Sequence, residues 1–231
     1  MEITLSDQFF QLVPNYKIGI IHYNNIRVED SPQMLKGRLR FFQESLAVDL
    51  LDKNVTDLEG IAEWRKVIKS LGGDPSRYRH SAEALYRRVK KQQFIPTIHS
   101  AADVNNFFSL KYEIPAGIYD FNKISGDVLL RIGNESDEYI GLNGRMNHLR
   151  NLPLSSDQIG PFGSLFVDSE RTAVTKETSS ILQIVYIRPS FSLENAEEML
   201  KSLQNMFLHI HGGFGECFVL HKDKHVQVLA K

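Results

Sequence analysis

Cysteine is nearly absent from this chain of 231 residues, which contains only Cys217. A single cysteine excludes an internal disulfide bond and is typical of a reducing compartment. The chain also lacks an apolar run close to the roughly 20 residues that a membrane span needs. Its first residues show no basic segment followed by an apolar core, which argues against a secretory signal. We therefore expect a cytoplasmic protein with no membrane partner.

A net excess of charge is absent too: the formal charge is -1 and the pI is about 6.7. The overall charge therefore does not indicate nucleic-acid binding. Residues 72–92 are a local exception, with six cations against two acids. Two interpretations stay open, a solvated helix face and an anion-binding patch. For the second, the side chains expected to bind phosphate groups are Arg79, Arg87, Arg88 and Lys91.

Internal repeats and low-complexity tracts are missing as well, and 42% of the residues are hydrophobic. This length and composition suit one domain, because single cores saturate at roughly 250–300 residues. We predict a single domain over 1–231 with three parts. They are a helical preface with one strand and two helices (1–73), a central core (74–190), and a terminal helix with a strand pair (191–231).

Helix starts are marked by small polar residues in front of apolar stripes of helical period. Such residues stand at Ser31, Thr56, Ser81, Ser100 and Ser192, and Thr56–Glu59 and Ser100–Asp103 read as capping boxes. Gly72-Gly73 and Gly212-Gly213 mark helix ends.

Strands are indicated by short β-branched and aromatic runs between polar turns. The segment 145–163 shows little periodicity and reads as a long loop. This order of elements predicts an α+β fold with mixed or antiparallel, sandwich-like sheets flanked by helices. The expected strands are 16–26, 118–121, 128–132, 138–142, 165–168, 172–175, 181–187, 217–220 and 226–229.

The histidines near Cys217 match no recurring zinc spacing, and Cys217 lies in an apolar pattern typical of a core. We predict no metal and no cofactor. No Ser-His-Asp arrangement occurs in a motif context.

Three segments in order carry a family resemblance: RYRHSAEALYRRV from Arg77, ADVNNFFSL from Ala102 and IPAGIYDFNKISG from Ile114, followed by Arg131 and Leu142-Asn143-Gly144. Over about 77–188 the chain resembles the editing domain of the phenylalanyl-tRNA synthetase beta subunit, the B-three/B-four domain, and is most similar to its freestanding form. The resemblance implies an α+β sandwich and a link to tRNA. In the synthetase this domain hydrolyses tyrosine wrongly attached to the phenylalanine tRNA. The aminoacylation core is missing, so we expect no tRNA charging by this chain alone.

Residue by residue, the resemblance matches the scaffold and alters the pocket. Asp103 and Asn106 stand where the family has its supporting Asp and Asn, and Gly117 takes the place of a pocket histidine. The strand that carries the family's pocket glutamate has Gln183 here and no carboxylate, and the glycine-rich loop before it is shortened to 169–172. The pocket residues expected from this match are Asp103, Asn106, Gly117, Asp120, Arg131, Asn143 and Gly144.

Several functions stay open at this point. One is a trans-editing hydrolase that cleaves the ester of a misacylated tRNA, with backbone N–H groups near Gly117 and Gly144 stabilising the oxyanion and no catalytic side chain assigned. The alternative is a non-catalytic binder of an amino-acid-like ligand, held by Asp120 and Arg131. Those two residues also suit a structural ion pair. A third reading is an interaction module with no small substrate. The oligomeric state is not indicated.

Overall fold

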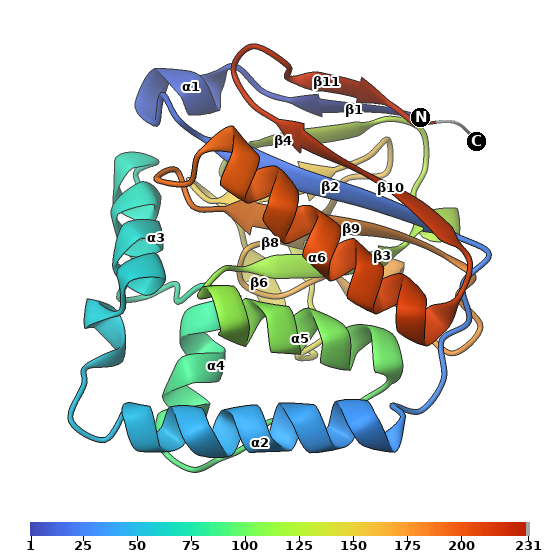
Figure 1. The fold of residues 1–231 in the computed structure, drawn as a ribbon. Helices are drawn as coiled ribbons and strands as arrows, with labels where there is room; N and C mark the ends of the chain where they lie inside the picture. The colour runs from blue at the N-terminus through green and yellow to red at the C-terminus, as the bar shows by residue number, and fades with distance from the viewer. Residues whose placement is uncertain (230–231) are drawn as a thin grey trace.

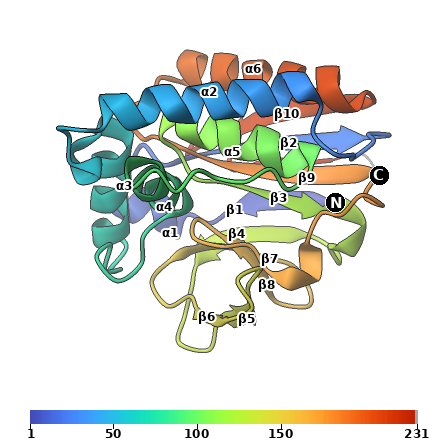
Figure 2. The ribbon, with the colours of Figure 1, turned by 90° about the horizontal axis from the view of Figure 1, so that it is seen from below.

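Three layers are stacked in the computed structural model, which describes residues 1–229: a helical layer, a four-stranded sheet and a five-stranded sheet (Figure 2). The α+β sandwich predicted from the sequence is therefore confirmed. The four-stranded sheet has the order β10 (Phe214–Leu220), β2 (Lys17–Asn24), β9 (Ser180–Ile187), β3 (Ala116–Asp120). The five-stranded sheet has the order β11 (Val226–Val228), β1 (Glu2–Leu5), β4 (Val128–Ile132), β7 (Pro153–Ser156), β8 (Pro161–Ser164).

The helices and the smaller elements surround these sheets (Figure 1). A two-stranded hairpin, β5 (Glu138–Ile140) with β6 (Met146–His148), projects below the five-stranded sheet in Figure 2. The helices are α1 (Gln8–Leu12), α2 (Gln33–Asp49), α3 (Glu59–Ser70), α4 (Ser81–Lys90), α5 (Ser100–Tyr112) and α6 (Leu193–His211). Three short 3-10 turns are η1 (Val55–Asp57), η2 (Phe121–Lys123) and η3 (Glu170–Thr172).

The central strands are apolar on both faces because each face meets another layer. In β2, Ile18 and Ile20 pack toward the five-stranded sheet, whereas Ile21 and Tyr23 belong to the core beneath the helices. The same alternation in β3 turns Gly117 and Tyr119 toward the space between the sheets, since Tyr119 belongs to the inter-sheet core and successive side chains point to opposite faces. This placement positions the candidate site described below.

The N-caps of α4 and α5 differ from the prediction by one residue. Both helices open with the tripeptide His-Ser-Ala, and the histidine, not the serine, is the N-cap. Nδ1 of His80 accepts from the N–H of Glu83, and Nδ1 of His99 accepts from the N–H of Ala102. The Ser100–Asp103 capping box is therefore wrong, because Ser100 already lies inside the helix.

Two further start signals were also misread. The Thr56–Glu59 capping box is wrong, because Thr56 lies in η1 and Glu59 is the first residue of α3. Ser31 does not cap α2: Pro32 holds the N-cap position, and the Ser31 hydroxyl donates to Asp103 instead. The prediction at Ser192 is confirmed, since its Oγ accepts from the N–H of Asn195.

The strand predictions fail where strands are very short. The expected loop 145–163 contains β6, β7 and the start of β8, whereas the expected strands 165–168 and 172–175 lie in irregular chain and at the end of η3. The predicted strands over β2, β3, β4, β5 and β9 are confirmed. The two closing strands exist, but β10 pairs with β2 and β11 pairs with β1, so they form no pair with each other.

The predicted division into 1–73, 74–190 and 191–231 stays a prediction, and residues 230 and 231 of its last part lie outside the described residues. The first of these parts contributes β2 to one sheet and β1 to the other. Within residues 1–229, no helix combines the length and apolarity that crossing a bilayer requires.

Candidate functional site

Three of the predicted pocket residues come together at one side of the molecule. Gly117 lies in β3, and Asn143 and Gly144 form the turn between β5 and β6. The link between them is Asp168: its carbonyl accepts from the N–H of Leu142 at 2.9 Å, and its Oδ1 lies 2.8 Å from the position of a Cβ built on Gly117. Asp168 immediately precedes the shortened loop 169–172, so all these parts meet at one place.

A tyrosine and a carboxylate fill the space that a side chain at position 117 would occupy. The hydroxyl of Tyr119 donates to Oδ1 of Asp168 at 2.7 Å. A Cβ on Gly117 would lie 2.1 Å from that hydroxyl, and a Cβ on Gly163 of β8 would lie 2.2 Å from it. Glycine is therefore required at both positions, because the Tyr119 hydroxyl is held between two backbones.

The surroundings of Asp168 disfavour the charged form of its carboxyl. Burial raises the pKa of the Asp168 carboxyl from 3.8 to about 7, because the charged form loses its water, while hydrogen bonds from Tyr119 and the Ile118 N–H hold the rise back. Asp168 in turn contributes to raising the pKa of Tyr119 well above its usual range, although burial of the ring is the larger cause. A carboxyl poised near neutral pH can take up and return a proton.

The β5–β6 hairpin is fixed beside Asp168 by its own polar contacts. Arg131 donates to both oxygens of Asp137 at 2.6 and 2.7 Å at the base of the hairpin. The Tyr139 hydroxyl donates to the carbonyl of Val167, the residue before Asp168, at 2.6 Å. A cavity of about 530 Å³ lies beside Ser169 and is lined by residues 138–140, 159–161 and 169–171, but not by Asp168.

Asp103 and Asn106 do not join this site. The Asp103 side chain is buried and accepts from the Ser31 hydroxyl and the Ile98 N–H, so it closes the start of α5. Asn105, not Asn106, faces the sheet: it accepts from Gln183 at 2.8 Å and donates to the carbonyl of Ala116 at 2.9 Å. The family match that pointed to Asn106 therefore names the residue next to the one that contacts the sheet.

Asp120 and Arg131 form neither the predicted ligand clamp nor the alternative ion pair with each other. Arg131 is bound to Asp137, as described above. Asp120 accepts from the Thr178 hydroxyl at 2.8 Å and from the N–H of Asn122 at 3.1 Å. Each side chain serves local structure. The Gly144 N–H is also occupied, because it donates to the carbonyl of Gly141 at 2.8 Å.

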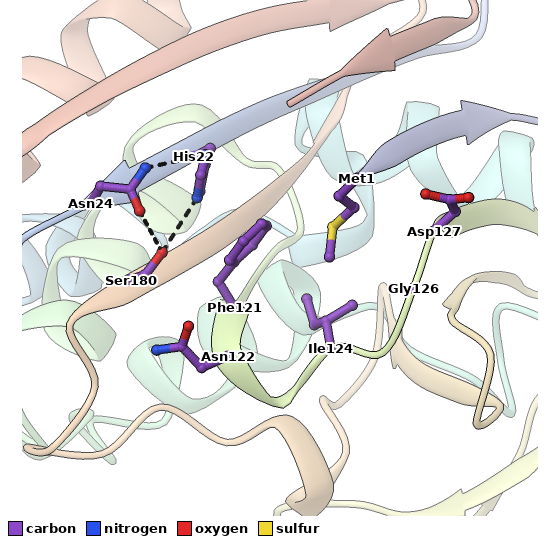
Figure 3. Close-up of a pocket in the computed structure, with 9 residues that line it drawn as sticks. All are labelled: Met1, His22, Asn24, Phe121, Asn122, Ile124, Gly126, Asp127 and Ser180. Atoms are coloured by element: carbon purple, nitrogen blue, oxygen red, sulfur yellow. Dashed lines mark hydrogen bonds between the residues drawn. The ribbon is translucent and has the colours of Figure 1, made fainter. Parts of the chain in front are cut away.

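A larger cavity of about 560 Å³ opens between the sheets near the end of β2 (Figure 3). At its base, Nε2 of His22 lies 3.3 Å from Oγ of Ser180, which is within 2.9 Å of Oδ1 of Asn24. Burial lowers the pKa of His22. The ring of Phe121 lies against that of His22, with the ring centres 4.2 Å apart and the planes tilted by 32°. Among residues 1–229 no group of histidine, cysteine and carboxylate side chains is arranged to hold a metal ion.

Of the four cations predicted for tRNA phosphates, Arg87 and Lys91 line a common cavity, and Arg79 and Arg88 do not. Arg79 precedes α4, and Arg88 and Lys91 are exposed near its end. Nε of Arg87 donates to Glu83 at 2.9 Å; Glu83 is fully buried and also pairs with Arg65. A cavity of about 370 Å³ brings Arg87 and Lys91 together with Lys90, which the prediction had left out, against residues 54–56.

The comparisons with known proteins agree with this architecture. The family model described as "B3/4 domain" matches residues 63–205. The chain belongs to the B3/4 domain family. It is also 35% identical over 213 residues to "Uncharacterized protein YhzB" of Bacillus subtilis (strain 168), a match that covers 92% of this chain and 96% of the relative.

Two weaker similarities are to parts of longer chains. Identity is 23% over 137 residues to the phenylalanine–tRNA ligase beta subunit of Fusobacterium nucleatum, which covers 58% of this chain and 16% of that subunit. An N-terminal fragment of the Pyrococcus horikoshii phenylalanyl-tRNA synthetase beta subunit is similar over 93% of this chain and 49% of its own, with 14% identity and a TM-score of 0.45. The chain therefore spans under a fifth of the one and about half of the other.

Asp168 and Tyr119 were not among the pocket residues expected from the sequence. They lie 49 positions apart: Tyr119 stands inside the segment IPAGIYDFNKISG but was not singled out there, and Asp168 stands in none of the three segments that carry the resemblance. The only signal is a carboxylate at the end of the apolar run Leu165–Val167.

Proposed function

We propose that this protein is a freestanding, tRNA-associated B3/4 protein that hydrolyses the ester bond of a misacylated tRNA in the cytoplasm. The observation that carries the proposal is the Tyr119–Asp168 pair in the space above Gly117. The resemblance puts the pocket histidine of the synthetase domain at position 117. This chain has an ionisable carboxyl with a pKa of about 7 in the same place.

In the proposed reaction, the carboxylate of Asp168 takes a proton from a water molecule as the water oxygen attacks the ester carbonyl. The tetrahedral intermediate then collapses, the bond between the carbonyl carbon and the ribose oxygen breaks, and the proton returns from Asp168 to that ribose oxygen. Free amino acid and intact tRNA are the products. General base catalysis of this kind contributes about 10²–10⁴-fold.

In this proposal, the β5–β6 hairpin next to Asp168 stabilises the oxyanion. The Gly144 N–H, considered from the sequence, is occupied. The N–H of Asn143 has no acceptor among residues 1–229, and it follows Leu142, which is bonded to the Asp168 carbonyl. We assign the oxyanion contact to Asn143, because a fixed backbone donor needs no reorganisation when charge develops.

For tRNA binding we propose the cavity formed by Arg87, Lys90 and Lys91, with Arg79 and Arg88 as outlying contacts. Glu83 holds Arg87 at Nε, and Lys90 donates to the carbonyl of Lys53, so both cations are held in position. Replacing Lys90 and Lys91 together by Ala should weaken the binding of every tRNA, whatever its sequence. The slope of log affinity against log salt concentration should become shallower by the equivalent of about two phosphate contacts. The matched control removes two exposed lysines of α3, Lys66 and Lys69.

The deciding experiment is deacylation of a panel of correctly and wrongly charged tRNAs, with wild type, Asp168→Asn and no protein. We expect ester loss for one or two mischarged species with wild type, and a loss of about 10²-fold or more in rate for Asp168→Asn. No ester loss on any species, with tRNA binding intact, would contradict hydrolysis while leaving the association with tRNA. Equal rates for wild type and Asp168→Asn would remove Asp168 from the mechanism.

A second candidate function, binding of a small amino-acid-like ligand, is favoured by the cavity of about 560 Å³ at His22. Its buried polar base and the Phe121 ring suit a ligand with a polar head and an apolar side chain. A ligand that binds only the folded state raises the melting temperature. A shift with one free amino acid that is lost in Ser180→Val would support this function, and no shift with any amino acid would count against it.

A further inference from the structure

The outward face of α2 carries a line of large apolar side chains. Met34, Phe41 and Val48 follow one another at intervals of seven residues and are 55%, 74% and 66% exposed. Seven residues make almost two helical turns, so the three side chains share one face. α2 lies at the outer edge of the helical layer (Figures 1 and 2). The opposite face of the helix is the buried one, formed by Leu35, Leu39, Gln43 and Ala47.

The charges of α2 are arranged against its own dipole. Its first half carries Lys36, Arg38 and Arg40, and its second half carries Glu44 and Asp49. The first turn has no acid and the last turn has no base. A helix alone prefers the reverse, with anions near its start and cations near its end. A neighbouring helix that runs in the opposite direction would compensate for this arrangement, because it sets acids beside the basic half.

The pattern on this face is symmetric about Phe41. Met34 and Val48 stand seven residues to either side of it, Gly37 and Ser45 four residues, and Arg38 and Glu44 three residues. We propose that α2 packs antiparallel against α2 of a second copy of this chain, with a two-fold axis beside Phe41. The axis then sets Met34 against Val48 of the other copy, and Arg38 against its Glu44. This inference does not depend on the proposed function.

Local details fit such a contact. A Cβ on Gly37 would meet no atom within 4 Å, which leaves room for the second helix. Glu44 uses Oε1 for Arg40 within its own helix at 2.8 Å, and Oε2 has no partner among residues 1–229. A parallel pair would instead bring the two basic halves together, so the charges select the antiparallel arrangement. One helix pair is smaller than a standard interface of about 1,600 Å², and a dimer of roughly micromolar affinity is expected.

The first test measures self-association of the full chain by sedimentation velocity from about 1 to 100 µM, the range that brackets a micromolar dissociation constant. We compare wild type with Phe41→Glu, which sets two carboxylates face to face on the axis. The matched control is Phe214→Glu, the same change at another exposed phenylalanine. We expect a monomer–dimer equilibrium that Phe41→Glu weakens at least tenfold and Phe214→Glu leaves unchanged. A monomer at every concentration, or a dimer equally tolerant of both changes, would overturn the proposal.

The second test reports geometry. In a Cys217→Ser background, Phe41→Cys should form a covalent dimer on mild oxidation. In contacting antiparallel helices, residues on the axis come within the roughly 7 Å between Cα atoms that a disulfide bond allows. Phe214→Cys should stay monomeric. Glu44→Lys should weaken the dimer, and adding Arg38→Glu should restore it. Failure of the double reversal to restore association would contradict the antiparallel register.

Discussion

The hydroxyl of Tyr119 donates to Oδ1 of Asp168 at 2.7 Å while lying against the backbones of both Gly117 and Gly163. This contact joins the two sheets, because Gly117 belongs to β3 and Gly163 to β8. It also fixes a titratable carboxyl beside the β5–β6 hairpin. Three predictions test the role of this contact, and a fourth tests the buried ion pairs of Glu83.

Stability should fall as pH rises from about 4 to about 7 because of Asp168. Its folded pKa of about 7 lies above the 3.8 of the unfolded chain, so the folded protein binds the extra proton between these values. The stabilisation is complete below about pH 4 and is lost as pH rises to about 7. Asp168→Asn should therefore be more stable than wild type at pH 8, on the order of 2 kcal/mol, with no gain at pH 4. Urea unfolding at both pH values measures this difference.

Tyr119→Phe should move the pH dependence of hydrolysis upward. The Tyr119 hydroxyl favours the ionised form of Asp168 and holds its pKa down, so removing it raises that pKa further. The pH at half-maximal rate should rise, whereas a purely structural change would alter the rate at all pH values alike. Tyr186→Phe is the control, since the buried Tyr186 hydroxyl has no partner among residues 1–229. An unchanged midpoint in Tyr119→Phe would contradict the coupling.

Gly117→Ala should destabilise the fold by about 1–3 kcal/mol, because the new Cβ would overlap the Tyr119 hydroxyl. The cost should shrink in a Tyr119→Val background, where the ring and hydroxyl are gone. A double-mutant cycle of unfolding free energies measures this coupling. Additive effects would show that the close approach at Gly117 is relieved in some other way.

Glu83→Gln should cost about 3 kcal/mol of unfolding free energy, because it leaves Arg65 and Arg87 without the buried carboxylate that they share. Glu135→Gln makes the same chemical change in the exposed pair with Arg150 and should cost less than about 1 kcal/mol. Thermal unfolding of both variants is the measurement, and equal costs would contradict the structural role of Glu83.

Helices and strands were predictable from the sequence where their hydrophobic pattern extends over many residues. β2 and β9 have eight residues each; β9 is buried throughout and β2 in all but its last residue, and α6 has a full apolar stripe. The strands β6, β7 and β8 have only three or four residues, too few to show a period of two. Their existence depends on partners elsewhere in the chain, which local pattern does not report.

The candidate site was predictable only in its scaffold. Gly117 and the Asn143-Gly144 turn were expected because the family resemblance points to these positions. Asp168 was not expected, since its raised pKa comes from burial by residues distant in sequence. Asn106 was expected because it aligns with the asparagine of the family motif, whereas its neighbour Asn105 makes the contact with the sheet.

The position of β1 has a consequence for synthesis of the chain. Ile3 pairs with Val128 on one side and with Gln227 on the other. During synthesis, β1 emerges long before the strands it pairs with. Its first neighbour, β4, follows only after more than 120 residues, and its second, β11, only after more than 220. Such distant pairing slows folding and leaves apolar strands unpaired for longer. We expect the nascent five-stranded sheet to be the part of this protein that depends most on chaperones.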